Sequence, residues 1–187
     1  LEEVAFHDGL QTIGKDAFSG TKLTSVKLPD TVTTIGAMAF QNCNLLQTVE
    51  LSAKLEILGS GAFKNCGTLT SIVIPKSLKK VSSTSSPFEG CANLSGVTIE
   101  AGISQIPAYL FRSCTGFTTI TLPNGVTSIG SNAFASTTLE EITIPATVTT
   151  IASSAFSGIT YLTIKGSAGS VAETFAKENN YTFVNIG

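Results

Sequence analysis

The chain has 187 residues, 42% of them hydrophobic, and a formal net charge of −2. It is long and apolar enough to bury a substantial core as one domain, yet only 13% of its residues are charged, about half the usual share. Nucleic-acid and membrane-surface binding need clustered Lys and Arg, so we expect no nucleic acid partner, and no apolar stretch is long enough for membrane insertion.

From its first residue the chain repeats one pattern about every 23 residues. A Phe marks each period, at Phe18, Phe40, Phe63, Phe88, Phe111, Phe134 and Phe156. One such unit cannot enclose its own apolar side chains, whereas a stack of units can share a continuous core. The period therefore predicts a solenoid.

The first half of each unit has the form Leu-x-x-Val-x-Leu. We count eight copies, from Leu1, Val4 and Phe6 to Ile159, Leu162 and Ile164. Alternation of apolar and polar residues is typical of a strand with one buried face. Proline follows four of these strands, and because it lacks a backbone N–H we expect it to end them.

The second half reads Val-x-x-Ile-Gly-x-x-Ala-Phe, as in Val32 to Phe40. We expect a second, shorter extended stretch here. Glycine at Gly36 and Gly130 is interpreted as allowing a sharp turn of the backbone, after which Ala-Phe brings a ring into the interior.

Together the two halves resemble the Treponema pallidum-type, or BspA-like, leucine-rich repeat, over residues 1 to about 165. The resemblance implies a β-rich solenoid, a right-handed superhelix with a parallel sheet on its concave face and short strands and turns on the convex side. It also implies a bacterial surface or secreted protein, of a family in which some members are implicated in adhesion to host proteins or other cells.

Two features interrupt or accompany the repeat. The interval between Phe63 and Phe88 is longer by two residues, at Ser82 to Pro87, which predicts a loop that is either part of a recognition edge or a tolerated polar bulge.

One Cys per unit follows the Phe by three residues in four copies, at Cys43, Cys66, Cys91 and Cys114. We interpret these as a column of buried free thiols.

After Ile164 the pattern stops. Ser170 and Glu173 form a capping-box motif that predicts a two-turn helix, and Tyr181 to Ile186 alternate like a strand. The apolar end of a solenoid needs a cover. We therefore expect residues 1–165 to form a solenoid that begins inside a larger chain, and residues 166–187 to form its C-terminal cap, close to the natural C-terminus.

The outward side chains of the strands should form two columns on the concave face. One column runs from Glu3 to Tyr161, beside Glu141, and the other from Ala5 to Thr163, beside Thr143. They are either a broad face for a partner or Ser and Thr that merely suit a solvated sheet. The candidate partner-binding residues are Ser25, Lys27, Thr48, Glu50, Ser71, Val73, Thr98, Thr119, Thr121, Glu141, Thr143 and Tyr161.

Signals of catalysis are weak. His7 is the single histidine and lacks a plausible partner for a triad. The single column of cysteines does not suit zinc, which needs ligands that converge tetrahedrally. We expect no enzyme activity and no cofactor, and a monomer that binds a protein or glycan on host or neighbouring cells; the alternative is a spacer rod without a ligand.

Overall fold

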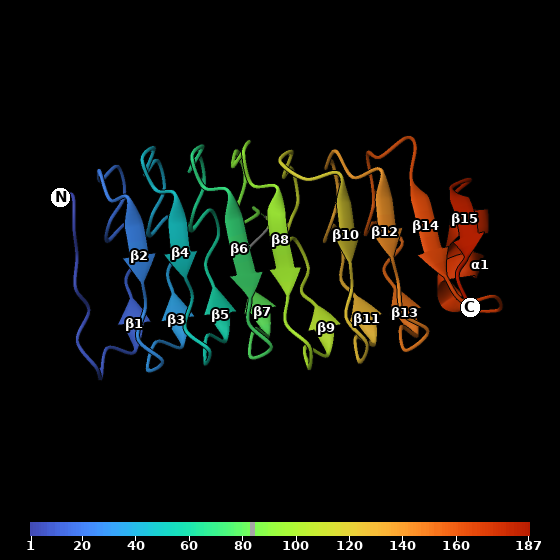
Figure 1. Cartoon of the computed structure of the whole chain (residues 1–187), viewed down its shortest axis with the longest axis horizontal. Coiled ribbons are helices and arrows are strands. Elements are labelled where there is room, and N and C mark those ends of the chain that lie inside the picture. The colour runs from blue at the N-terminus through green and yellow to red at the C-terminus, as the bar shows by residue number, and fades with distance from the viewer. Residues whose placement is uncertain (83–84) are drawn as a thin grey trace.

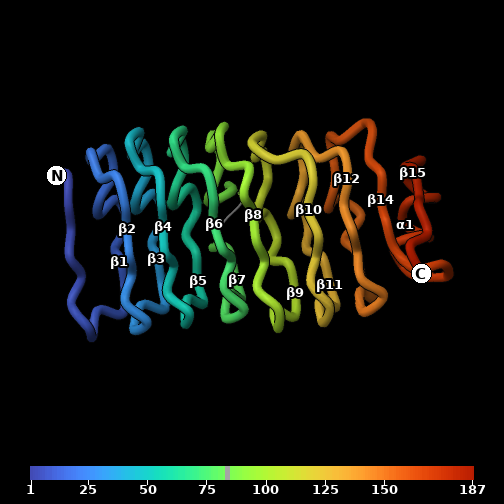
Figure 2. Tube along the Cα trace, in the orientation of Figure 1, coloured from blue at the N-terminus to red at the C-terminus, as the bar shows by residue number. Residues whose placement is uncertain are grey.

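The computed structural model describes residues 1–82 and 85–187. Successive turns of the chain lie side by side along one axis, with the two ends of the chain at opposite ends of the rod (Figures 1 and 2). The protein is a parallel β-solenoid of about eight turns, with a helix near the C-terminus. The predicted solenoid is confirmed.

Most turns contribute a long strand and a two-residue strand. The long strands are β2 (Ser25–Lys27), β4 (Thr48–Glu50), β6 (Ser71–Ile74), β8 (Gly96–Ile99), β10 (Thr119–Thr121), β12 (Glu141–Thr143) and β14 (Thr163–Gly166). The short strands are β1 (Thr12–Ile13), β3 (Thr34–Ile35), β5 (Ile57–Leu58), β7 (Lys80–Val81), β9 (Gln105–Ile106), β11 (Ser128–Ile129) and β13 (Thr150–Ile151).

All ladders are parallel, but they form groups rather than one continuous sheet. In the described residues the long strands join as β2-β4, β6-β8 and β10-β12-β14-β15, and the short strands as β1-β3-β5-β7 and β9-β11-β13. The interruption between β7 and β9 coincides with the interval that is two residues longer. The long strands β6 and β8 nevertheless pair in register across the same interval.

The first copy of the pattern forms no strand, contrary to our prediction of a strand in each of the eight copies. Leu1 to Phe6 run alongside β2 (Figure 1), where the Leu1 carbonyl accepts a hydrogen bond of 2.9 Å from the Lys22 amide, and Val4 and Phe6 stay half-buried. An eighth long strand comes instead from the C-terminal segment, as β15 (Thr182–Asn185), which pairs with β14.

The repeat Phe residues stack through the centre of the solenoid. Neighbouring rings from Phe18 to Phe156 are stacked, with centroids 5.2 to 6.0 Å apart. From Phe40 onward each ring is fully buried, and Phe18 is half-buried. At the C-terminal end, Phe175 packs edge-to-face against Phe156, with ring centroids 5.7 Å apart. The prediction of a continuous Phe core is confirmed.

Glycine has a different role from the one we expected at Gly36 and Gly130. Neither residue has a positive φ. A Cβ on Gly36 would lie 2.7 Å from the Lys15 amide nitrogen, and one on Gly130 would lie 2.6 Å from that of Ala108. Glycine therefore lets the backbones of adjacent turns approach closely. The sharp-turn interpretation was wrong.

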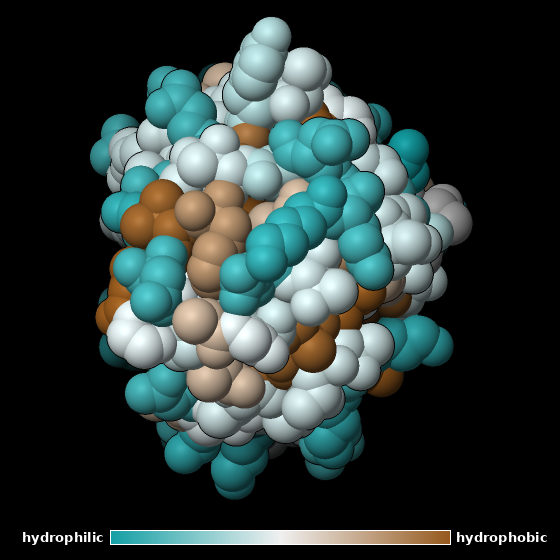
Figure 3. Space-filling model, turned by 90° about the vertical axis from the view of Figure 1, so that its right-hand side faces the viewer, coloured by the Kyte–Doolittle hydropathy of each residue, from teal (hydrophilic) through white to brown (hydrophobic). Residues whose placement is uncertain are grey.

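Helix α1 (Val171–Glu178) covers the last turn. The Ser170 hydroxyl accepts from the Glu173 amide at 3.4 Å, as a helix cap does. The Glu173 carboxylate accepts from Gly169 at 2.6 Å, one residue earlier than a capping box requires. Phe175 is buried on the inner side of α1. Seen from this end, apolar residues form separate patches between polar ones (Figure 3).

Candidate binding surface

The outward side chains of the long strands form one face, which we call the long-strand face. Eleven of the twelve candidate residues lie on these strands, all but Tyr161. Adjacent strands bring them together in pairs: Ser25 lies beside Thr48, and Val73 beside Thr98. Successive side chains of each strand point alternately into the core and out to solvent, so the short polar residues form rows on the outside.

Charges on the long-strand face neutralise one another. Lys27 Nζ lies 2.7 Å from Glu50 Oε2, and Lys165 Nζ lies 2.8 Å from Glu141 Oε2. The hydrogen bond from Lys27 to Glu50 raises the pKa of the lysine. With these charges paired, the surface offers a partner mainly hydroxyl groups.

A shallow hollow lies in the middle of this face. It has a volume of about 410 Å³ and is bordered by Gly96, Thr98, Thr119 and neighbouring residues of β8 and β10. Gly96 has no side chain to fill it, and Val73, on the strand next to β8, is 49% exposed. An exposed apolar group beside a hollow is a common element of a contact surface.

The last turn has a different register from the one expected from its sequence. Thr163 pairs with Glu141, and Lys165 pairs with Thr143. Tyr161 does not lie beside Glu141, because it precedes the first residue of β14. The expected columns were wrong here by two residues, and Tyr161 corresponds to Leu139.

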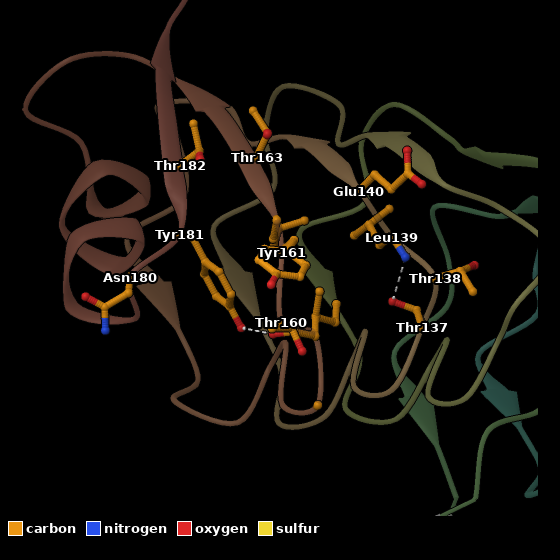
Figure 4. A pocket seen from close by; sticks show the side chains of 13 residues that line it. Thr137, Thr138, Leu139, Glu140, Thr160, Tyr161, Thr163, Asn180, Tyr181 and Thr182 are labelled. Carbon is orange, nitrogen blue, oxygen red and sulfur yellow. Dashed lines mark hydrogen bonds between the residues drawn. The ribbon is translucent and has the colours of Figure 1, made fainter.

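This displacement changes the surroundings of Tyr161. Residues at the same place in the two preceding turns, Phe117 and Leu139, are 2% and 1% exposed, whereas Tyr161 is 86% exposed. Beside it lies a hollow of about 510 Å³ (Figure 4) between the last two turns and the C-terminal segment, lined by residues 137–140, 158–163 and 180–182. A Tyr where the repeat has Leu or Phe is the sequence signal that could have revealed this hollow.

The cysteines line the core as predicted, with an added function. All four are free and buried. The thiols of Cys43, Cys66 and Cys91 each donate a hydrogen bond of 3.1 Å to the carbonyl of the repeat Phe one turn earlier. Burial raises the pKa of Cys91 and Cys114 to about 12. Cys91 and Cys114 are thus protonated thiols, whereas the hydrogen bond with Cys66 lowers the pKa of Cys43 to about 6.

At the end of the stack a tyrosine takes over that function. The Tyr181 hydroxyl donates to the carbonyls of Phe156 and Ile159, at 3.2 and 3.1 Å. The ring lies beside Phe175, with centroids 6.4 Å apart. Burial raises the pKa of Tyr181. The C-terminal segment therefore satisfies the last Phe carbonyl where no further turn supplies a thiol.

The longer interval is partly integrated into the fold. Ser86 is buried and its hydroxyl donates to the Leu110 carbonyl at 3.0 Å. Ser85 donates at 2.7 Å to Glu89, which also pairs with Lys64 at 2.8 Å. Residues 83 and 84 of the predicted loop lie outside the described residues.

The part of the chain that the structure describes contains no cluster of metal-binding side chains. Nowhere in residues 1–82 and 85–187 do three or more His, Cys, Asp or Glu side chains gather as a metal would require. His7 is exposed, and its Nδ1 lies 2.9 Å from the Asp8 carbonyl oxygen. Within the same residues, no helix has the length and hydropathy needed to span a membrane.

Comparison with a family model agrees with this repeat geometry. The model of the BspA type leucine rich repeat region, in six copies, matches residues 1–85, 46–163 and 84–185. The chain belongs to this family. Among curated proteins no match was found.

Solved bacterial leucine-rich repeat proteins have the same fold. A protein from Bacteroides ovatus is 27% identical over 100% of this chain and 49% of its own, with a TM-score of 0.71. A leucine rich cell surface protein from Faecalibacterium prausnitzii is also 27% identical, over 93% of this chain and 55% of its own, with a TM-score of 0.57. This chain therefore spans about half the length of these proteins.

The Treponema pallidum leucine-rich repeat protein, whose repeat type the sequence resembles, has 22% identity and a TM-score of 0.51. The alignment covers 95% of this chain and 81% of that protein. At this identity the similarity supports the fold alone.

Proposed function

We propose that this BspA-type repeat chain is a non-enzymatic binding module of a bacterial cell-surface or secreted protein, and that its partner is a protein or glycan on host or neighbouring cells. The observation that carries the proposal is the long-strand face. Its charges are paired, its hydroxyl groups are exposed in rows, and Val73 lies exposed beside a hollow. A broad surface of this kind suits a large partner.

The cell-surface location is supported by the neighbour from Faecalibacterium prausnitzii, which is described as a cell surface protein. We propose that the module acts as a monomer, which light scattering on the purified chain would test. The spacer alternative is favoured by one observation, the unbroken stack of Phe rings from Phe18 to Phe156, which suits a stiff rod.

Binding assays distinguish the two functions. The folded chain would be immobilised and tested against purified host matrix proteins and whole bacterial cells. Val73→Glu and Thr98→Glu place charge on the long-strand face, whereas Thr150→Glu places it on the exposed side of β13 as a matched control. We expect Val73→Glu and Thr98→Glu each to abolish binding, and Thr150→Glu to leave it unchanged. Retained binding in all three would refute the long-strand face, and no binding by the folded chain would favour the spacer.

A further inference from the structure

The hollow beside Tyr161 combines an exposed aromatic ring with unengaged polar groups. Of its lining residues, Thr138 and Tyr181 use their hydroxyls to bond backbone carbonyls of the solenoid. In the described part of the chain, the side chains of Thr160, Tyr161 and Thr163 make no hydrogen bond to the protein. These hydroxyls are free to bond a ligand.

The exposure of Tyr161 is unusual within this fold. Its counterparts Phe117 and Leu139 are buried, whereas in the last turn the following residue, Leu162, is the buried one. Tyr181 lines the same hollow (Figure 4), and its hydroxyl is bonded to the Phe156 carbonyl. Tyr161 therefore presents its ring to solvent, although burying a ring of this size is normally favourable.

The hollow is close to neutral. Glu140 is the single charged residue among those that line it, and the remainder are mostly Thr and apolar residues. A phosphate or other anion would find no cation in this lining. Its volume of about 510 Å³ falls in the ordinary range of small-molecule sites.

From these observations we propose that the hollow bounded by Tyr161, Thr160, Thr163 and Glu140 is a saccharide-binding site, which takes one or two neutral pyranose rings of a glycan. One face of a pyranose carries C–H groups that pack on an aromatic ring, and its hydroxyls both donate and accept hydrogen bonds. Thr hydroxyls supply both functions and the Glu140 carboxylate supplies an acceptor. A protein anchor would instead require a deep apolar socket.

This inference rests on the proposed binding function and adds a site apart from the long-strand face. It is tested by saturation-transfer NMR of the folded chain with methyl β-galactoside, methyl β-glucoside, N-acetylglucosamine, lactose and N,N′-diacetylchitobiose. Each would be present at about 10 mM, above the dissociation constant of a weak millimolar complex. We expect saturable transfer to at least one of them.

Variants assign the binding to this hollow. Tyr161→Ala should weaken binding about tenfold or more, which corresponds to about 1.4 kcal/mol, whereas Tyr161→Phe keeps the ring and should stay within about threefold. Thr150→Ala, an exposed position on β13 outside both the hollow and the long-strand face, should leave sugar binding unchanged. Because Tyr161 is 86% exposed, thermal unfolding should be the same in all variants.

Two results would overturn the proposal. One is absence of transfer to every sugar by the folded chain, and the other is sugar binding that Tyr161→Ala does not weaken. Neither result bears on the long-strand face, which is tested separately by its own charged variants. Conversely, sugar binding at Tyr161 would stand even if no protein partner bound that face.

Discussion

Replacing one ring in the middle of the Phe stack should destabilise the solenoid more than replacing the ring at its end. Phe63 is fully buried and stacks on Phe40 at 5.2 Å and on Phe88 at 5.7 Å. Burial of a Phe side chain contributes about 1.5 to 3 kcal/mol, and the cavity left behind increases the loss. We therefore expect Phe63→Ala to cost about 3 to 5 kcal/mol.

Phe18 is the matched control, since it is the same residue in the same unit but is half-buried, with one stacked neighbour. We expect Phe18→Ala to cost about half as much, in proportion to the smaller area lost. Unfolding by urea can be followed by far-UV circular dichroism, which does not need the Trp that this chain lacks. Equal losses at Phe18 and Phe63, or a loss below about 1 kcal/mol at Phe63, would refute the stacked-core argument.

Three further predictions concern contacts between turns. The pKa of Cys91 is raised from 9.0 to about 12 in the folded chain, so the contribution of its protonated thiol to stability is present below pH 9 and lost as the pH rises toward 12. In urea titrations over this pH range, the free energy of unfolding should fall less in Cys91→Ala than in the unchanged chain. An equal fall in both would contradict this prediction. Tyr181→Phe should cost about 0.5 to 1.5 kcal/mol because it removes the hydrogen bonds of the hydroxyl. Tyr161→Phe should cause no measurable change in thermal unfolding. Equal effects of the two variants would count against the Tyr181 contact. Gly59→Ala should cost about 1 to 3 kcal/mol, because the added Cβ would clash with a backbone carbon of Gly36. Gly67→Ala serves as the control, since a Cβ there would meet open space. Similar unfolding midpoints for the two variants would refute the close packing of turns at Gly59.

Much of the fold follows from the sequence because the repeat is local and regular. The alternation in Leu-x-x-Val-x-Leu predicted which side chains enter the core, and the position of Cys43 and its counterparts relative to Phe predicted a buried column. Both predictions are confirmed. Identical units in identical environments need the same side chain at the same place, so the pattern of one turn describes the others.

The candidate surface was only partly predictable. The strands that carry Lys27 and Glu50 could be aligned from the period, which correctly paired these two residues. The alignment failed at Tyr161, because the last turn was matched by its apolar residues alone. Whether a row of polar side chains binds a partner depends on the residues around it in space. The alternating pattern of a strand does not reveal those neighbours.

By itself the sequence determined the repeat, its buried faces and the helix that follows Ser170, since each depends on residues close together in the chain. The tertiary structure alone decided the features that depend on neighbouring turns. These are the close backbone contact at Gly36, the thiol donors to Phe carbonyls, and the hydrogen bond from the Tyr181 hydroxyl to the Phe156 carbonyl. Each joins atoms about one full turn apart in sequence, and their distance is set by how the turns stack.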